Sequence, residues 1–169
     1  MSASQKWLIQ AGIFLILLGL VYGLVHTFLV KHETLPVLRE SYRGAFAAAA
    51  LGQLERSQAS LEQAKKMNYR YVRVIDVHTH VIKLATLLVL IGFLYPQVSW
   101  GKKTKSLLAV GFVTGTWLFP AGVFVEIFST STFPKVLAAG GALLAIGSFA
   151  LILLGIARGI RQSLPGEGA

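Results

Sequence analysis

The stretch WLIQAGIFLILLGLVYGLVHTFLV, from Trp7 to Val30, contains no Lys, Arg, Asp or Glu. A helix rises about 1.5 Å per residue, so about 20 apolar residues are enough to cross the ~30 Å hydrocarbon core of a bilayer. The stretch is longer than the apolar part of a secretory signal peptide, which has about 7–15 residues, and no A-x-A cleavage site precedes the charged segment after it. We therefore interpret it as a retained membrane-spanning helix.

Three further apolar stretches are long enough to cross a membrane, at about 77–95, 106–128 and 136–156. The composition agrees, because 54% of the 169 residues are hydrophobic, 14% are charged and the mean hydropathy is +0.65. An average soluble domain has about 25% charged residues. The chain has no cysteine, which excludes a disulfide framework and thiolate metal sites. The sequence predicts an all-α integral membrane four-helix bundle that forms a single membrane domain over residues 1–169.

The segment 31–73 between the first two spans is expected to be helical and to lie outside the membrane. From Pro36 to about Met67 it is rich in Ala, Leu, Gln and Glu and has no further proline. Gly52 is a candidate for a break. We predict a helical extramembrane insertion, either one helix or a hairpin. The tail 165–169 is expected to be frayed.

The charge distribution predicts the orientation and the partners. The net charge is +9, but the basic residues flank apolar spans, which favours the lipid bilayer as a partner and gives no support for nucleic acid. Short loops weigh most in the positive-inside rule. We therefore expect a bacterial inner-membrane protein with both termini cytoplasmic and the loop 31–73 periplasmic. The basic residues on the cytoplasmic side would be Lys6, Lys102, Lys103, Lys105, Arg158 and Arg161.

Ionisable residues inside the spans are the main indication of function, because burying them in a membrane is costly. When the four helices are threaded alternately through the bilayer, these residues fall at one membrane face. The opposite face has a lysine cluster but no histidine. The residues of this group are His26, His32, Asp76, His78, His80, Lys83 and Glu126.

Glycines indicate which side chains point into the bundle. Gly12, Gly19 and Gly23 share a stripe with His26, and Tyr22 lies beside it. Small residues at helical spacing let neighbouring helices approach closely. A similar stripe, Gly111, Gly115 and Gly122, leads to Glu126 in the third span. His26 and Glu126 are therefore expected to face other helices.

The two histidines of the second span cannot face the same direction. His78 and His80 are two residues apart, which places them about 200° apart around the helix. Asp76, His80 and Lys83 share one face at spacings of four and three residues. One histidine is expected to enter the bundle, and the other to meet the loop or the lipid headgroups.

Several chemistries fit this group. A b-type haem would take His26 and His80 as axial ligands, with His78 as the substitute, and Arg70 or Arg73 would meet its propionates. A metal ion such as Zn, Cu, Fe or Ni would take His26, His80, Asp76 and Glu126. A proton or quinol site would use His and Glu. In the haem case Asp76, Glu126, Lys83 and Tyr22 would support the ligands or form a proton path. The plain alternatives are helix packing by the glycines and histidines that reach water at the membrane surface.

The segment VIDVHTHVIKLATLLVLIGFLYP, from Val74 to Pro96, resembles the H-x-H entry into a span of small bacterial membrane proteins related to haem–copper oxidase subunits. The resemblance covers about 20 residues and implies at most one haem-binding module. The third and fourth spans contain no histidine, so it implies neither a binuclear centre nor oxygen reduction.

The expected function is a small membrane redox protein or redox-complex subunit. It would hold one b-type haem or a metal near the outer membrane face and transfer electrons to or from quinol or a partner. The alternative is a non-catalytic accessory or assembly subunit of a larger membrane complex. A third possibility is a metal-ion carrier or sensor. The nucleotide-binding, zinc-protease and serine-hydrolase motifs are absent from the sequence, and no catalytic residue is predicted.

Overall fold

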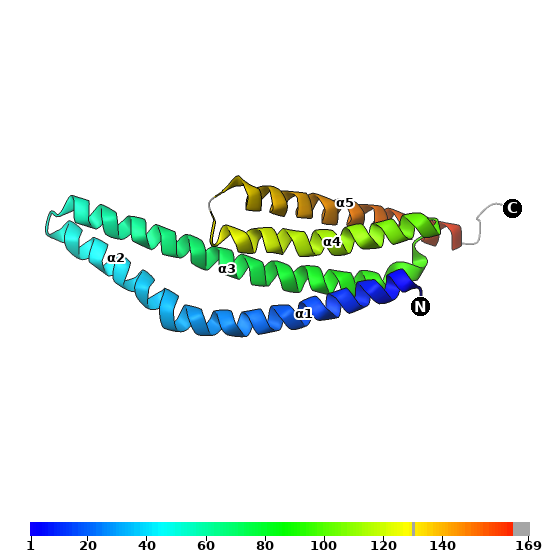
Figure 1. The fold of residues 1–169 in the computed structure, drawn as a ribbon, viewed down its shortest axis with the longest axis horizontal. Coiled ribbons are helices and arrows are strands. Elements are labelled where there is room, and N and C mark those ends of the chain that lie inside the picture. Colours follow the sequence, from blue (N-terminus) through cyan, green and yellow to red (C-terminus); the bar gives the residue numbers. More distant parts are fainter. Residues whose placement is uncertain (130, 164–169) are drawn as a thin grey trace.

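The computed structural model describes residues 1–129 and 131–163, and the tail 165–169 lies outside this part (Figure 1). Within it the chain is all-α, as the sequence predicts. The elements are α1 (Ala3–Leu29), the π-helical turn η1 (Val30–Thr34), α2 (Leu35–Ala50), α3 (Leu54–Leu94), the 3-10 turn η2 (Tyr95–Gln97), α4 (Lys102–Glu126) and α5 (Thr132–Ser163).

Among the described residues, four helical stretches are long and apolar enough to cross a membrane, which confirms the number of candidate spans. They are Ala3–Ala50, Leu54–Gln97, Lys102–Glu126 and Thr132–Gln162. The surface carries many large apolar side chains, such as Leu24 of α1 and Leu143 of α5, which are 75% and 74% exposed.

The segment 31–73 is helical nearly throughout. A helical hairpin forms from α2 and the first half of α3, and it extends beyond the ends of α4 and α5 (Figure 1). Gly52 makes the turn, with a φ of +71° that L-residues with a side chain rarely adopt. The Gly52 amide donates to the Ala49 carbonyl (3.0 Å) and the Gln53 amide to the Ala48 carbonyl (2.9 Å), which together form a Schellman C-cap. The break predicted at Gly52 is therefore confirmed.

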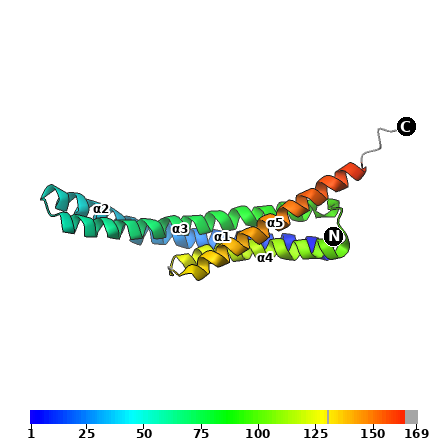
Figure 2. The same cartoon turned by 90° about the horizontal axis from the view of Figure 1, so that it is seen from above.

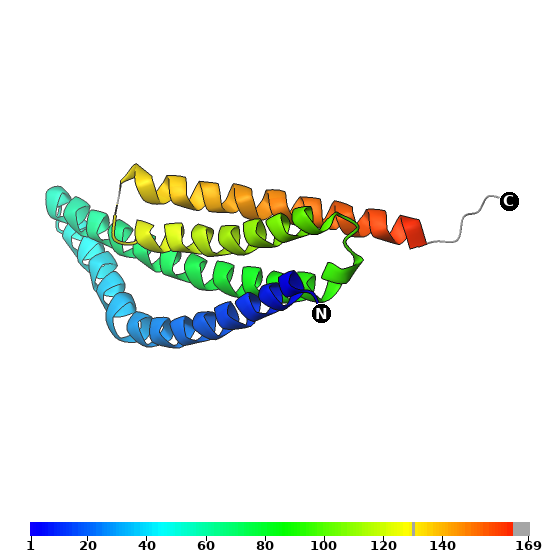
Figure 3. The ribbon, with the colours of Figure 1, turned by 45° about the vertical axis from the view of Figure 1, so that its right-hand side comes forward.

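The helices form two pairs that meet along one line. α1 packs on α3, α4 packs on α5, and α4 also contacts both α3 and α1. In Figure 3 the order across the molecule is α5, α4, α3 and α1, and Figure 2 shows α5 running obliquely across α4. The place where three helices meet is therefore formed by α1, α3 and α4.

Candidate functional site

Polar side chains gather at the end of the α1–α3–α4 junction that lies nearest the hairpin. We call this group the polar layer. Ring contacts join one set of its members, from α1 to α3, and ion pairs join another set, from α3 to α4. Its residues are Tyr22 and His26 of α1, Tyr71, Arg73, Asp76 and His78 of α3, and Glu126 of α4.

His26 is the central side chain of the polar layer. Its ring lies between two tyrosines, with centroids 6.3 Å from Tyr22 and 6.4 Å from Tyr71. Its Nε2 atom is buried and has no hydrogen-bond partner among the residues that the structure describes. Most buried polar atoms are hydrogen-bonded, so a buried nitrogen without such a bond is unusual.

His78 lies against the glycine stripe of α1. Its Nδ1 is 3.1 Å from the Gly19 carbonyl oxygen, so Nδ1–H donates and Nε2 is left as the acceptor. Its ring covers Gly23, where a Cβ atom would be 2.6 Å from the His78 Cε1. His78 is also a neighbour of His26. The stripe thus provides the space that the imidazole occupies.

His80 points to a different neighbour, as the 200° separation predicts. Its ring meets Phe119 of α4 edge-on, with centroids 4.7 Å apart. The histidine beside His26 is therefore His78, where the sequence favoured His80 as the partner. Whether any of these histidines binds a ligand stays a prediction.

Arg73 joins the two acidic residues of the polar layer. Its guanidinium lies 3.4 Å from the Glu126 Oε2 and 3.6 Å from the Asp76 Oδ2. It also covers the Tyr69 ring at 5.2 Å. Glu126 is only 8% exposed, and a buried carboxylate needs a positive partner. Both acids therefore lie against a guanidinium, and their predicted roles in supporting a ligand, in a proton path or as metal ligands stay predictions.

Four of the sequence candidates lie outside the polar layer: His80, which contacts Phe119, and Arg70, Lys83 and His32. Arg70 and Lys83 are exposed on α3. His32 is also exposed, and its ring lies 4.7 Å from that of Phe28.

The metal and haem predictions can be compared with this geometry. Within residues 1–129 and 131–163, no three His, Asp or Glu side chains come close enough to hold a metal ion. A haem between α1 and α3 would need room for a flat macrocycle. In the packed state a Cβ on Gly12 would lie 2.9 Å from the Ala85 carbonyl oxygen, and His78 fills the space at Gly23. The residues therefore do not fit a haem unless α1 and α3 separate.

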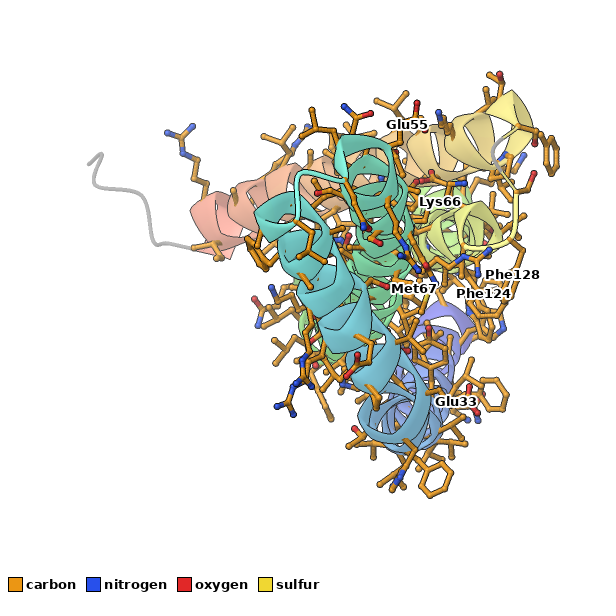
Figure 4. All side chains as sticks on the ribbon, turned by 90° about the vertical axis from the view of Figure 1, so that its left-hand side faces the viewer. Glu33, Glu55, Lys66, Met67, Phe124 and Phe128 are labelled. Carbon is orange, nitrogen blue, oxygen red and sulfur yellow. The ribbon has the colours of Figure 1, made fainter. Side chains whose placement is uncertain are left out.

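A cavity of about 440 Å³ lies directly beside the polar layer, between α1, α3 and α4. Tyr22 belongs to both, and its ring meets Phe124 edge-on at 6.1 Å. Viewed from the hairpin end, Phe124 lies between α4 and α1 (Figure 4). The wall is almost entirely apolar, and its residues are Leu15, Leu18, Gly19, Val21, Tyr22, Val25, Val77, Val81, Trp117, Pro120, Ala121 and Phe124.

Sequence reasoning missed this cavity. The wall combines three helices that are distant in sequence, and each contributes residues that look like ordinary span residues. The one usable indication was that Gly19 and Tyr22 precede His26 on the same side of α1.

The relation of this chain to known proteins adds no further residues to the site. No family model, no curated protein and no solved structure matches the chain. Its site must therefore be interpreted from its own residues.

Proposed function

We propose that this chain is an integral membrane protein in which α1, the second half of α3, α4 and α5 cross the bilayer and the hairpin lies outside it. The apolar exposure of α1 and α5 supports the proposal, since such surfaces would face lipid. The lysines at 102, 103 and 105 lie in the first turn of α4, directly after the short connection from α3. By the positive-inside rule this end is cytoplasmic, in a bacterial inner membrane, and the hairpin is periplasmic.

The cysteine-free chain gives a direct test of this topology, because any introduced thiol is the only one. Gln53→Cys places it in the hairpin turn, and Lys103→Cys places it at the other end; both positions are exposed. A membrane-impermeant maleimide added to intact spheroplasts should label Gln53→Cys and leave Lys103→Cys unlabelled until the cells are opened. The reverse pattern would overturn the orientation, and labelling of both in intact cells would overturn the membrane topology.

We further propose that the chain is a subunit of a membrane redox complex, and that the polar layer exchanges protons and electrons with quinol or a partner protein near the outer membrane face. The observation that carries this proposal is the buried His26 Nε2, which has no hydrogen-bond partner in the part of the chain that the structure describes. A polar atom that lacks a hydrogen bond is costly at membrane depth, so we expect this nitrogen to bind a ligand or a proton. The ion pair of Arg73 and Glu126, 3.4 Å between nitrogen and oxygen, is a second ionisable site of the polar layer.

A bound b-type haem or metal stays a prediction within this proposal. The atoms available for it are the Nε2 of His26 and the Nε2 of His78. A backbone carbonyl on Nδ1, as Gly19 provides for His78, is a common support for a ligating histidine. Binding would require α1 and α3 to move apart.

The test uses protein purified in mild detergent from its native membrane, with its stoichiometric partners. An optical spectrum before and after dithionite reduction, with metal analysis, should show a redox-active group in the purified assembly. His26→Ala should lower the quinol-dependent activity of that assembly at least tenfold. The exposed His32→Ala is the matched control and should leave activity unchanged. An assembly without any redox group, or full activity in His26→Ala, would contradict the proposal.

The second candidate, a non-catalytic accessory subunit, is favoured by the tip of the hairpin. Phe46, Leu51 and Leu54 are 72%, 73% and 70% exposed there, outside the proposed membrane region. Contiguous exposed apolar side chains often mark a protein–protein contact. Phe46→Ser with Leu54→Ser should then release co-purifying partners, while the exposed Gln58→Ser should not. Retention of the partners by the double variant would count against this candidate.

A further inference from the structure

We infer that the cavity between α1, α3 and α4 binds the headgroup of a prenylated quinone that enters sideways from the bilayer. This inference rests on the proposed function, because it names the ligand that the polar layer serves. It is carried by the position of the cavity, by the aromatic residues of its wall, and by the contact of one of them, Tyr22, with His26, whose Nε2 has no partner among the described residues.

The cavity has a buried floor and an exposed rim. The floor includes Leu15, Val77 and Val81, which are 1%, 5% and 8% exposed. The rim includes Val21 and Val25, which are 60% and 53% exposed. In the proposed membrane arrangement this rim faces lipid. A ligand that reaches the cavity must therefore dissolve in the bilayer.

Aromatic residues stand on both sides of the space. Trp117 and Phe124 come from α4, and Tyr22 comes from α1. A flat conjugated ring gains from contact with such side chains beyond the area that it buries. A quinone headgroup is flat and conjugated, whereas a saturated acyl chain has no such ring.

The polar layer lies at one end of the cavity. Tyr22 lines the cavity and its ring is nearly parallel to that of His26, at 7°, and the buried His26 Nε2 has no hydrogen-bond partner among the described residues. An imidazole nitrogen can donate a hydrogen bond to a quinone carbonyl in one tautomer and accept one from a quinol hydroxyl in the other. A quinone would thus provide the partner that this nitrogen lacks, which an acyl chain cannot do.

The cavity provides its own reporter for a binding experiment. The full chain is placed in nanodiscs of quinone-free phospholipid and titrated with a short-tailed ubiquinone, and tryptophan emission is recorded. Quenching of Trp117 should saturate, and the saturable part should vanish in Trp117→Phe, which keeps Trp7 and Trp100. Ala121 is exposed on the cavity wall. In Ala121→Phe the larger side chain should fill part of the cavity and weaken quinone binding at least tenfold. The matched control Ala139→Phe, at an exposed alanine of α5, should bind as the original chain does.

The headgroup contact has a separate readout. His26→Ala should weaken binding of the quinone at least fivefold and leave binding of a prenyl chain without a headgroup unchanged. Equal affinity for the quinone and for the prenyl chain without a headgroup would mean that lipid chains fill the cavity. This result would overturn the inference. Unchanged quinone affinity in Ala121→Phe would overturn it as well.

Failure of this inference can be told apart from failure of the proposed function. Quinone binding that is insensitive to Ala121→Phe, in an assembly whose activity depends on His26, leaves the redox proposal standing and removes the cavity. Quinone binding at the cavity in an assembly without any redox group would support the cavity and contradict the redox proposal.

Discussion

The α4–α5 and α1–α3 interfaces are both lined by glycines at helical spacing, yet the two are built differently. At Gly115 and Gly122 of α4, an added Cβ would meet the backbone of α5, 2.8 Å from the Ala145 Cα and 2.7 Å from the Ala138 Cα. At Gly19 and Gly23 of α1, it would meet side-chain ends of α3 instead, at 2.6 Å in each case.

The α1–α3 interface also changes along its length. Near the N-terminus, at Gly12, it is close to the α3 backbone, and toward Gly23 it holds the His78 ring. α1 bows away from α3 in the same direction (Figure 1). A glycine stripe can therefore either hold two helices in close backbone contact or leave space for a ring such as that of His78. The sequence pattern is the same in both cases.

The largest effect is expected at the α4–α5 interface. Gly115→Ala places a methyl group against the Ala145 backbone, which cannot yield as a side chain can. We expect the free energy of unfolding to fall by about 3 kcal/mol, measured by SDS titration with circular dichroism in detergent. A loss no greater than that of an exposed-face glycine substitution would show that this interface is not locked.

The second largest effect concerns the link between the two helix pairs. Arg73→Gln removes the positive partner of Glu126, which is 8% exposed. The expected loss is about 2 kcal/mol, below the ~3–5 kcal/mol typical when one partner of a fully buried pair is removed, because Arg73 itself is 34% exposed.

The double variant Arg73→Gln/Glu126→Gln is the control for this prediction. It should recover most of the lost stability, because no uncompensated carboxylate remains. A double variant as unstable as Arg73→Gln alone would mean that Arg73 acts by packing and not by charge.

A smaller effect is expected at the α1–α3 interface. Gly23→Ala pushes against the His78 ring and should weaken its hydrogen bond to Gly19. We expect a loss of about 1 kcal/mol and a changed histidine Nδ1 signal in the NMR spectrum. In the double variant Gly23→Ala/His78→Ala the two losses should not add, because the second change removes the group that the first displaces. If the two losses of stability simply add, the effect of Gly23→Ala does not act through His78.

The smallest effect is expected on the open face of α5. A Cβ at Gly140 or Gly147 would meet no described atom within 4 Å. Either glycine changed to alanine should leave stability unchanged or raise it by up to about 1 kcal/mol, through the better helix propensity of alanine. Thermal unfolding of the two variants measures this. A clear loss would reveal a contact of this face in the membrane, such as a second subunit.

The helices themselves were largely predictable from the sequence. The four apolar stretches each lie within or largely overlap one long helix, and Gly52 makes the expected turn. The ends were less predictable, because the second apolar stretch begins near residue 77 whereas α3 begins at Leu54. Hydropathy marks the apolar part of a helix, and a polar helix continuing it gives no such mark.

The candidate site was predictable only in part. The sequence showed that His78 and His80 face different directions, but not which of them meets α1. Arg73 was a candidate for a haem propionate, and its pairing with Glu126 joins residues 53 positions apart, from Arg73 on α3 to Glu126 on α4. The side chain that a residue meets depends on how each helix is rotated about its axis, and no local pattern specifies that rotation.

The sequence by itself determined that this chain forms long apolar helices with a helical segment between the first two apolar stretches. Hydrophobicity and helix propensity act locally and add up along the chain, so they can be evaluated without knowing any neighbour. Only the tertiary structure decided that His26 lies beside His78, that Arg73 joins two acids, and that a cavity opens next to Tyr22. These features exist only where α1, α3 and α4 meet, and the glycines of α1 set how closely α1 packs on α3 there.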